Sequence, residues 1–121
     1  MMRLTIRISV ENKQNIQRVV DDDGDMHCGL QSRCIEWGLK QAFSMIKEKG
    51  CEFLYQKDRE KSNGNCNICI SVADSTATEF NRLCRAHKRD YKSIGHRIAQ
   101  WATEAALKEW KETGTVSSFY R

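Results

Sequence analysis

The sequence predicts a mainly α-helical chain in which two short strands pair as an antiparallel ribbon in front of four helices. Three observations lead to this fold class. The chain repeats its own pattern, each copy opens with alternating apolar and polar residues, and each copy continues with two stretches at helical spacing. The absence of proline from all 121 residues also suits a mostly helical protein.

The second half of the chain matches the first at a fixed offset. From Ile16 onward the offset is 64, which aligns Trp37 with Trp101, and upstream it is 62, which aligns Ile6 with Ile68. A unit of about 46 residues buries too little surface to offset its own chain entropy. We therefore expect the two copies to share one core.

Each copy opens with a strand, because apolar and polar residues alternate strictly there. The side chains expected to face inward are Leu4, Ile6, Ile8, Cys66, Ile68 and Ile70. Those expected to face outward are Arg3, Thr5, Arg7, Asn65, Asn67 and Cys69.

A first helix follows each strand. In the first copy it is expected from about residue 11 to residue 22, with its apolar face at Ile16, Val19 and Val20. In the second copy Thr76 and Glu79 have the spacing of a capping box. The apolar face there continues through Phe80, Leu83, Cys84 and His87.

A longer second helix completes each copy. The apolar spacing predicts it from Leu30 to Lys49 and from Ser93 to Glu112. Gly50 and Gly114, 64 residues apart, are expected to end these helices.

The chain is thus expected to form one cooperative domain of four segments. These are a first copy (1–49), a tether (50–64), a second copy (65–114) and a tail (115–121). The centre of the tether, Phe53-Leu54-Tyr55, is apolar and is expected to pack on the body. The tail is too short for an independent structure.

Charge is distributed unevenly between the copies. The formal net charge is +4, which is compatible with a polyanionic partner. Residues 1–48 carry 7 Lys and Arg against 7 Asp and Glu, a net charge of zero, whereas residues 66–121 carry 9 against 6, a net charge of +3. The acidic stretch 21–25 of the first copy aligns with the basic stretch 85–89 of the second. One end of the molecule should therefore attract phosphate more strongly than the other.

The sequence contains no run of about 18 apolar residues, the length that spans a membrane, and its start lacks the apolar region of a signal peptide. We therefore expect a cytoplasmic protein with no membrane association. In that compartment the six cysteines are expected to be thiols.

The outward strand residues suggest a function. A lone strand leaves one edge unpaired, and two such strands satisfy each other by pairing antiparallel. The outward side chains would then share one exposed face. A two-stranded ribbon fits the major groove of B-DNA, where Arg, Asn and Thr contact base edges.

The order of strand, helix, turn and helix after an alternating N-terminal strand resembles the ribbon-helix-helix superfamily of the Arc and MetJ repressors. A tandem form in one chain resembles the TraY-type accessory proteins of conjugative plasmids. The resemblance covers everything but the tether and tail, and it implies tandem ribbon-helix-helix repeats that form an intramolecular pseudo-dimer.

The same resemblance implies which residues contact double-stranded DNA. Base contacts would come from Arg3, Thr5, Arg7, Asn65, Asn67 and Cys69. Phosphate contacts would come from the starts of the long helices, at Gly29, Leu30, Gln31, Lys92, Ser93 and Ile94. A helix N-terminus is in any case a site for anions. The implied role is a transcriptional regulator or a plasmid-transfer accessory factor, with further copies of the protein on adjacent sites.

Two features depart from this pattern. Cys69 lies where the first copy has Arg7, and a thiol is a poor reader of bases; the acidic turn would also repel DNA unless it points away. They favour an alternative, a protein-interaction module such as an antitoxin or an inhibitor on the same scaffold. A second alternative is a domain-swapped dimer in which two chains exchange strands.

Other chemistry finds little support. Cys66 and Cys69 would point to opposite faces of a strand, which disfavours a zinc site, and the acidic turn lacks the calcium-loop pattern. His27, His87 and His96 form no triad with a nucleophile. We therefore expect neither an enzyme nor a cofactor.

Two further pairs of matched residues have competing interpretations. Trp37 and Trp101 are expected to be packing residues of the core or a groove. Arg33 and Arg97 would form ion pairs on the helix surface or, alternatively, bind phosphate.

Overall fold

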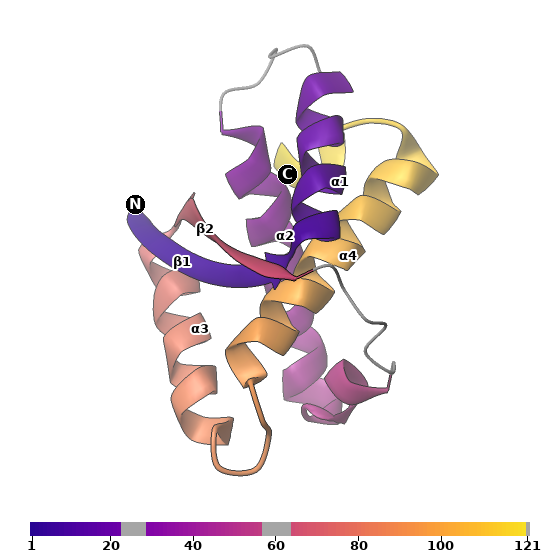
Figure 1. The fold of residues 1–121 in the computed structure, drawn as a ribbon. Helices are drawn as coiled ribbons and strands as arrows, with labels where there is room; N and C mark the ends of the chain where they lie inside the picture. The colour runs from indigo at the N-terminus through magenta and orange to yellow at the C-terminus, as the bar shows by residue number, and fades with distance from the viewer. Residues whose placement is uncertain (23–28, 57–63, 121) are drawn as a thin grey trace.

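The computed structural model describes residues 1–22, 29–56 and 64–120. The acidic turn beyond Asp22, His27 and residues 57–63 of the tether therefore lie outside the described residues. The described part confirms a mainly helical chain with four α-helices and one two-stranded antiparallel sheet (Figure 1). The elements in order are β1 (Met2–Ser9), α1 (Val10–Asp22), α2 (Leu30–Lys49), the 3-10 helix η1 (Glu52–Tyr55), β2 (Asn65–Val72), α3 (Asp74–His87), α4 (Ile94–Thr113) and the 3-10 helix η2 (Ser117–Tyr120).

The two strands form an antiparallel ribbon in front of the helices (Figure 1). The register pairs Ile6 with Ile68 at its centre, and Arg7 with Asn67 beside them. Burial alternates along both strands as expected from the sequence. The inward residues Leu4, Ile6, Ile8, Ile68 and Ile70 are buried, and Cys66 is half-buried.

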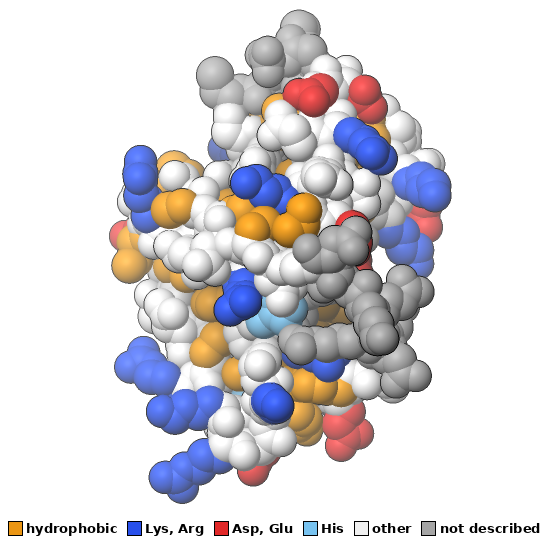
Figure 2. All heavy atoms as spheres, in the orientation of Figure 1, with side chains coloured by type: hydrophobic (Ala, Val, Ile, Leu, Met, Phe, Trp, Pro, Cys, Tyr) orange, Lys and Arg blue, Asp and Glu red, His pale blue; other side chains and the backbone are white. Residues whose placement is uncertain are grey.

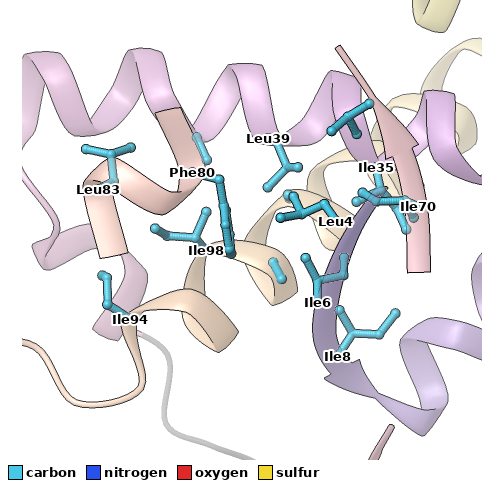
Figure 3. Packing of buried hydrophobic residues seen from close by; sticks show 14 of the residues in the cluster. Leu4, Ile6, Ile8, Ile35, Leu39, Ile70, Phe80, Leu83, Ile94 and Ile98 are labelled. Atoms are coloured by element: carbon cyan, nitrogen blue, oxygen red, sulfur yellow. The ribbon is translucent and has the colours of Figure 1, made fainter. Parts of the chain in front are cut away.

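The inward face of the ribbon packs on α2 and α4 to form the main core. Figure 3 shows Leu4 of β1 beside Leu39 of α2, and Phe80 of α3 beside Ile98 of α4. Leu83 and Ile94 continue the cluster beyond Phe80. Each fully buried side chain of this size contributes about 1.5–3 kcal/mol, so this layer is a large source of stability. A second cluster lies between α1, α2 and α4, and contains Ile16, Val19, Leu30, Cys34, Ala106 and Phe119.

The long helices α2 and α4 cross at a very close contact. Gly38 of α2 lies against the backbone of Ala102 of α4, so a Cβ at position 38 would overlap the Ala102 carbonyl group. The helices begin 64 residues apart, at Leu30 and Ile94, and both end at a glycine. The backbone N–H groups of Gly50 and Gly114 donate to the carbonyl oxygens of the helices they end, which confirms both expected stops.

The starts of α1 and α3 are capped differently. At α1 the Ser9 hydroxyl oxygen accepts a hydrogen bond from the Asn12 N–H at 3.1 Å, a side-chain N-cap. The predicted capping box at Thr76 is wrong, because α3 begins earlier, after Ala73, and Thr76 lies buried inside its first turn. The Glu36 carboxylate of α2 instead accepts the Ala73 N–H at 2.7 Å, so the side chain that binds the N-cap residue of α3 comes from another helix.

The tether and the tail both pack on the body, each against the long helix of the other half of the chain. Phe53 of η1 meets Trp101 of α4 edge to face, with ring centroids 5.3 Å apart. Phe119 of η2 meets Trp37 of α2 in the same way at 5.5 Å. The expected packing of the tether centre and of the tryptophans is therefore confirmed. The tail gains its structure by docking on α2, and its Phe119 is buried.

The two matched arginines also contact these segments. The Arg97 guanidinium lies over the ring of Tyr55 at 4.7 Å, and the Arg33 guanidinium lies over Tyr120 at 5.1 Å. Both contacts have cation–π geometry. The sequence predicted either an ion pair or a phosphate contact for these two arginines, and it did not indicate this role.

Candidate nucleic-acid interface

The outward side chains of the ribbon form one exposed face. Arg3, Thr5, Arg7, Asn65, Asn67 and Cys69 are all exposed. The register sets Arg7 opposite Asn67 and Thr5 opposite Cys69, so both pairs are cross-strand neighbours on this face. Arg3 and Arg7 are four residues apart, or about 13 Å along an extended strand. This face is thus comparable in length to the width of the major groove, about 12 Å.

Ser71 belongs to the same face, and the sequence analysis did not select it. It is exposed, and it lies opposite Arg3. The signal was present, because the alternation of β2 continues two residues beyond Cys69. The residue at the corresponding end of β1, Ser9, is buried and caps α1, so the two ends of the face differ.

Side chains of α2 and α4 bind the ends of the ribbon from behind. The Ser9 N–H donates to Gln100 Oε1 at 2.9 Å, and 64 residues later the Ala73 N–H donates to Glu36 Oε2 at 2.7 Å. Positions 36 and 100 are themselves 64 apart. Each long helix thus binds the chain at the end of the strand from the other half: α4 at the end of β1, and α2 at the end of β2.

A second pair of contacts holds the backbone at Arg7 and Ser71. His96 Nδ1 of α4 lies 2.7 Å from the carbonyl oxygen of Arg7, so the ring donates from Nδ1. The Ser71 N–H donates to the Ser32 hydroxyl oxygen of α2 at 3.0 Å. These two bonds restrain the backbone of β1 at Arg7 and of β2 at Ser71. The exposed face is therefore held in one geometry before any ligand binds.

The predicted phosphate sites lie at the starts of α2 and α4. Gly29 and Ser93 precede the helices in the left-handed conformation, with φ angles of 72° and 56°, and neither start has a side-chain cap. Neither first turn contains an acidic residue, so its partial positive charge is not neutralised there. The side chains of Leu30 and Ile94 are buried, so these two positions could contact phosphate only through their backbone amides. Gln31 is half-buried and Lys92 is exposed.

Tyr55 of η1 contacts the turn before α4. Its hydroxyl donates to the Lys92 carbonyl oxygen at 2.7 Å, and its ring stacks on Tyr91 with centroids 5.4 Å apart. The tether therefore restrains one of the two predicted phosphate sites. The sequence predicted that Tyr55 packs on the body of the protein. The spacing of residues along the chain could not predict that its partners are Tyr91 and Lys92.

The residues considered for metal or acid–base chemistry are dispersed. Cys69 is exposed and Cys66 is half-buried, on opposite faces of β2. Among residues 1–22, 29–56 and 64–120, no group of three or more His, Cys, Asp and Glu side chains could hold a metal ion. His87 makes an edge contact with Tyr91, while His96 bonds to the ribbon backbone.

Comparisons with protein-family models, curated proteins and solved structures return no match to this chain. A search of the described helices for one long and apolar enough to cross a membrane finds none.

Proposed function

We propose that the chain is a sequence-specific binder of double-stranded DNA that inserts the β1–β2 ribbon into the major groove. The observation that carries this proposal is the register of the ribbon. It gathers Arg3, Thr5, Arg7, Asn65, Asn67 and Cys69 on one exposed face, with Arg7 directly opposite Asn67. Two arginines and two asparagines on a face of groove dimensions match the side chains that form bidentate contacts with guanine and adenine.

We further propose that the two halves are tandem ribbon-helix-helix units packed as an intramolecular pseudo-dimer. Two contacts between matched positions support it, Ile6 with Ile68 in the ribbon and Gly38 with Ala102 between the long helices. Both pairs combine a residue with its own counterpart, which is the behaviour expected at a two-fold axis.

In this mechanism bases and phosphates are contacted by different parts of the protein. The ribbon side chains would contact base edges, and the backbone amides at the starts of α2 and α4 would contact phosphates on either side. Because both halves lie in one chain, binding would need no prior dimerisation. The two copies carry different outward residues, so the preferred site would be asymmetric. The resemblance to TraY-type proteins suggests a cytoplasmic role in plasmid transfer or transcription, with further copies bound alongside.

The test is enrichment of bound duplexes from a random pool, followed by a salt titration on the recovered sequence. We expect a motif without a palindrome, and log K falling linearly with log salt concentration. Sedimentation should give a mass of 14.0 kDa for the free protein; twice that mass would indicate strand exchange between chains.

One observation favours a second candidate function, a protein-interaction module of the antitoxin or inhibitor type. Cys69 occupies the position that matches Arg7, and an exposed thiol in the centre of the face contributes little to base recognition. Absence of any DNA binding at low salt would support this candidate and exclude the first.

A further inference from the structure

The two ends of the molecule differ in charge. α1 and α3 both start at the ribbon and run to opposite ends of the molecule (Figure 1). Figure 2 shows acidic side chains over the far end of α1 and basic side chains over the far end of α3. The matched positions Asp21 and Arg85 carry opposite charges, and both are exposed.

The basic end is a compact group that we name the basic end surface. Its members, all exposed, are Arg85, Lys88, Arg89 and Lys92. Asp90 is the one acidic residue among positions 85–92, so the formal charge of this stretch is +3. At the other end, Asp21 and Asp22 give the last turn of α1 a charge of −2. In the sequence, the stretch 21–28 that matches 85–92 has four Asp and no Lys or Arg, a formal charge of −4, so the two matched stretches differ by seven charges.

The backbone that carries the basic end surface is restrained. The N–H groups of Asp90 and Tyr91 both donate to the His87 carbonyl oxygen, at 3.1 and 3.0 Å, which closes the turn after α3. Tyr55 then holds the next residue through its hydrogen bond to the Lys92 carbonyl and its stack on Tyr91. The basic side chains therefore project from a defined position.

The distance from the ribbon suits a contact with flanking DNA. α3 has 14 residues and extends roughly 20 Å from the ribbon, or about six base pairs at 3.4 Å each.

We infer that the basic end surface, held in place by Tyr55, anchors the DNA backbone on the α3 side of the ribbon only. The protein then covers an asymmetric stretch of duplex that extends farther beyond the ribbon on the α3 side than on the α1 side. This inference rests on the proposed DNA-binding function.

The experiment is hydroxyl-radical footprinting on the duplex recovered from the random pool, with equal flanks of about one and a half helical turns. The wild type should protect several more base pairs on one flank than on the other. The double variant K88Q/R89Q should lose that extra protection and keep the central footprint. Its salt slope should fall by about 1.8, the value for two phosphate contacts.

The matched control is K108Q/K111Q, which removes the same charge from exposed positions far along α4. It should leave the footprint unchanged. Y55F removes only the hydroxyl and should weaken the flanking protection while the central footprint persists.

Equal protection on both flanks of the wild type would overturn the inference and leave the proposed function standing. One-sided protection that persists in the K88Q/R89Q variant would also overturn the inference and leave the proposed function standing. Failure to recover any specific duplex would instead overturn the proposed function itself.

Discussion

Gly38 of α2 lies directly against the backbone of Ala102 of α4, at positions that the internal offset of 64 makes equivalent. A Cβ at position 38 would lie 2.6 Å from the Ala102 carbonyl carbon and 2.9 Å from its Cα. Backbone atoms at the centre of a helix cannot move aside as a flexible side chain can. The absence of a side chain at Gly38 is therefore what allows α2 and α4 to approach so closely beneath the ribbon.

Replacing Gly38 by alanine should lower the free energy of unfolding by about 1–3 kcal/mol. The overlap forces the two helices apart, and the higher helix propensity of alanine offsets only about 1 kcal/mol. Chemical denaturation would measure the change. Gly95→Ala is the matched control, because its new Cβ would meet the Cys84 sulfur at 3.2 Å, a side-chain atom able to shift. Equal losses in both variants would contradict the importance of the Gly38 contact.

Arg7→Ala should weaken binding to the selected duplex by about 1–3 kcal/mol and relax base preference at one position. The reason is that Arg7 stands on the exposed face opposite Asn67, where it can contact a guanine through two hydrogen bonds. Fluorescence titration against the selected and a scrambled duplex would measure both effects. Arg7→Lys keeps the positive charge but lacks the planar guanidinium that donates two parallel hydrogen bonds. This variant should therefore keep the salt dependence of binding and still lose the base preference. If Arg7→Ala binds the selected duplex as tightly as the wild type, Arg7 does not contact a base.

Phe119→Ala should destabilise the protein by about 3 kcal/mol, since the ring is buried against Trp37 and its removal leaves a cavity. Thermal unfolding and a change in tryptophan emission would report the loss. The neighbouring Tyr120 is exposed and contacts Arg33 through its ring face, so Tyr120→Ala should cost only about 0.5–1 kcal/mol. Comparable losses at the two positions would mean that the docking of the tail does not depend on the buried ring.

Stability should fall at alkaline pH partly through Cys84. Burial raises the pKa of this thiol from its ordinary value of 9.0 to about 11. The folded state favours the protonated thiol, so the stability it contributes is complete below pH 9 and is lost as the pH rises through 11. Between pH 8 and pH 10 the wild type should lose about 1 kcal/mol more than Cys84→Ser. Parallel pH profiles of the two proteins would show that Cys84 does not titrate in this way.

Much of the fold and of the candidate face could be predicted because the patterns that define them are local. The alternation in residues 3–9 and 65–71 predicted which side chains point outward, and the structure confirms their exposure. The apolar spacing predicted a helix from Leu30 to Lys49, which are its observed bounds. Thr76 shows where a local pattern fails. Its spacing with Glu79 suited a cap, but Glu79 pairs with Arg82, and the carboxylate that accepts the Ala73 N–H comes from Glu36.

The sequence by itself determined the strands and α-helices of this protein, their order, the faces they bury and the offset between matched positions. Only the tertiary structure decided the long-range partners. It set Phe53 of the tether on Trp101 and Phe119 of the tail on Trp37, so that each segment packs against the far half of the chain. The physical reason is that burial imposes a period on the residues of one strand or helix. Contacts between distant segments depend instead on how closely whole helices approach, and at Gly38 that distance is set by one missing side chain.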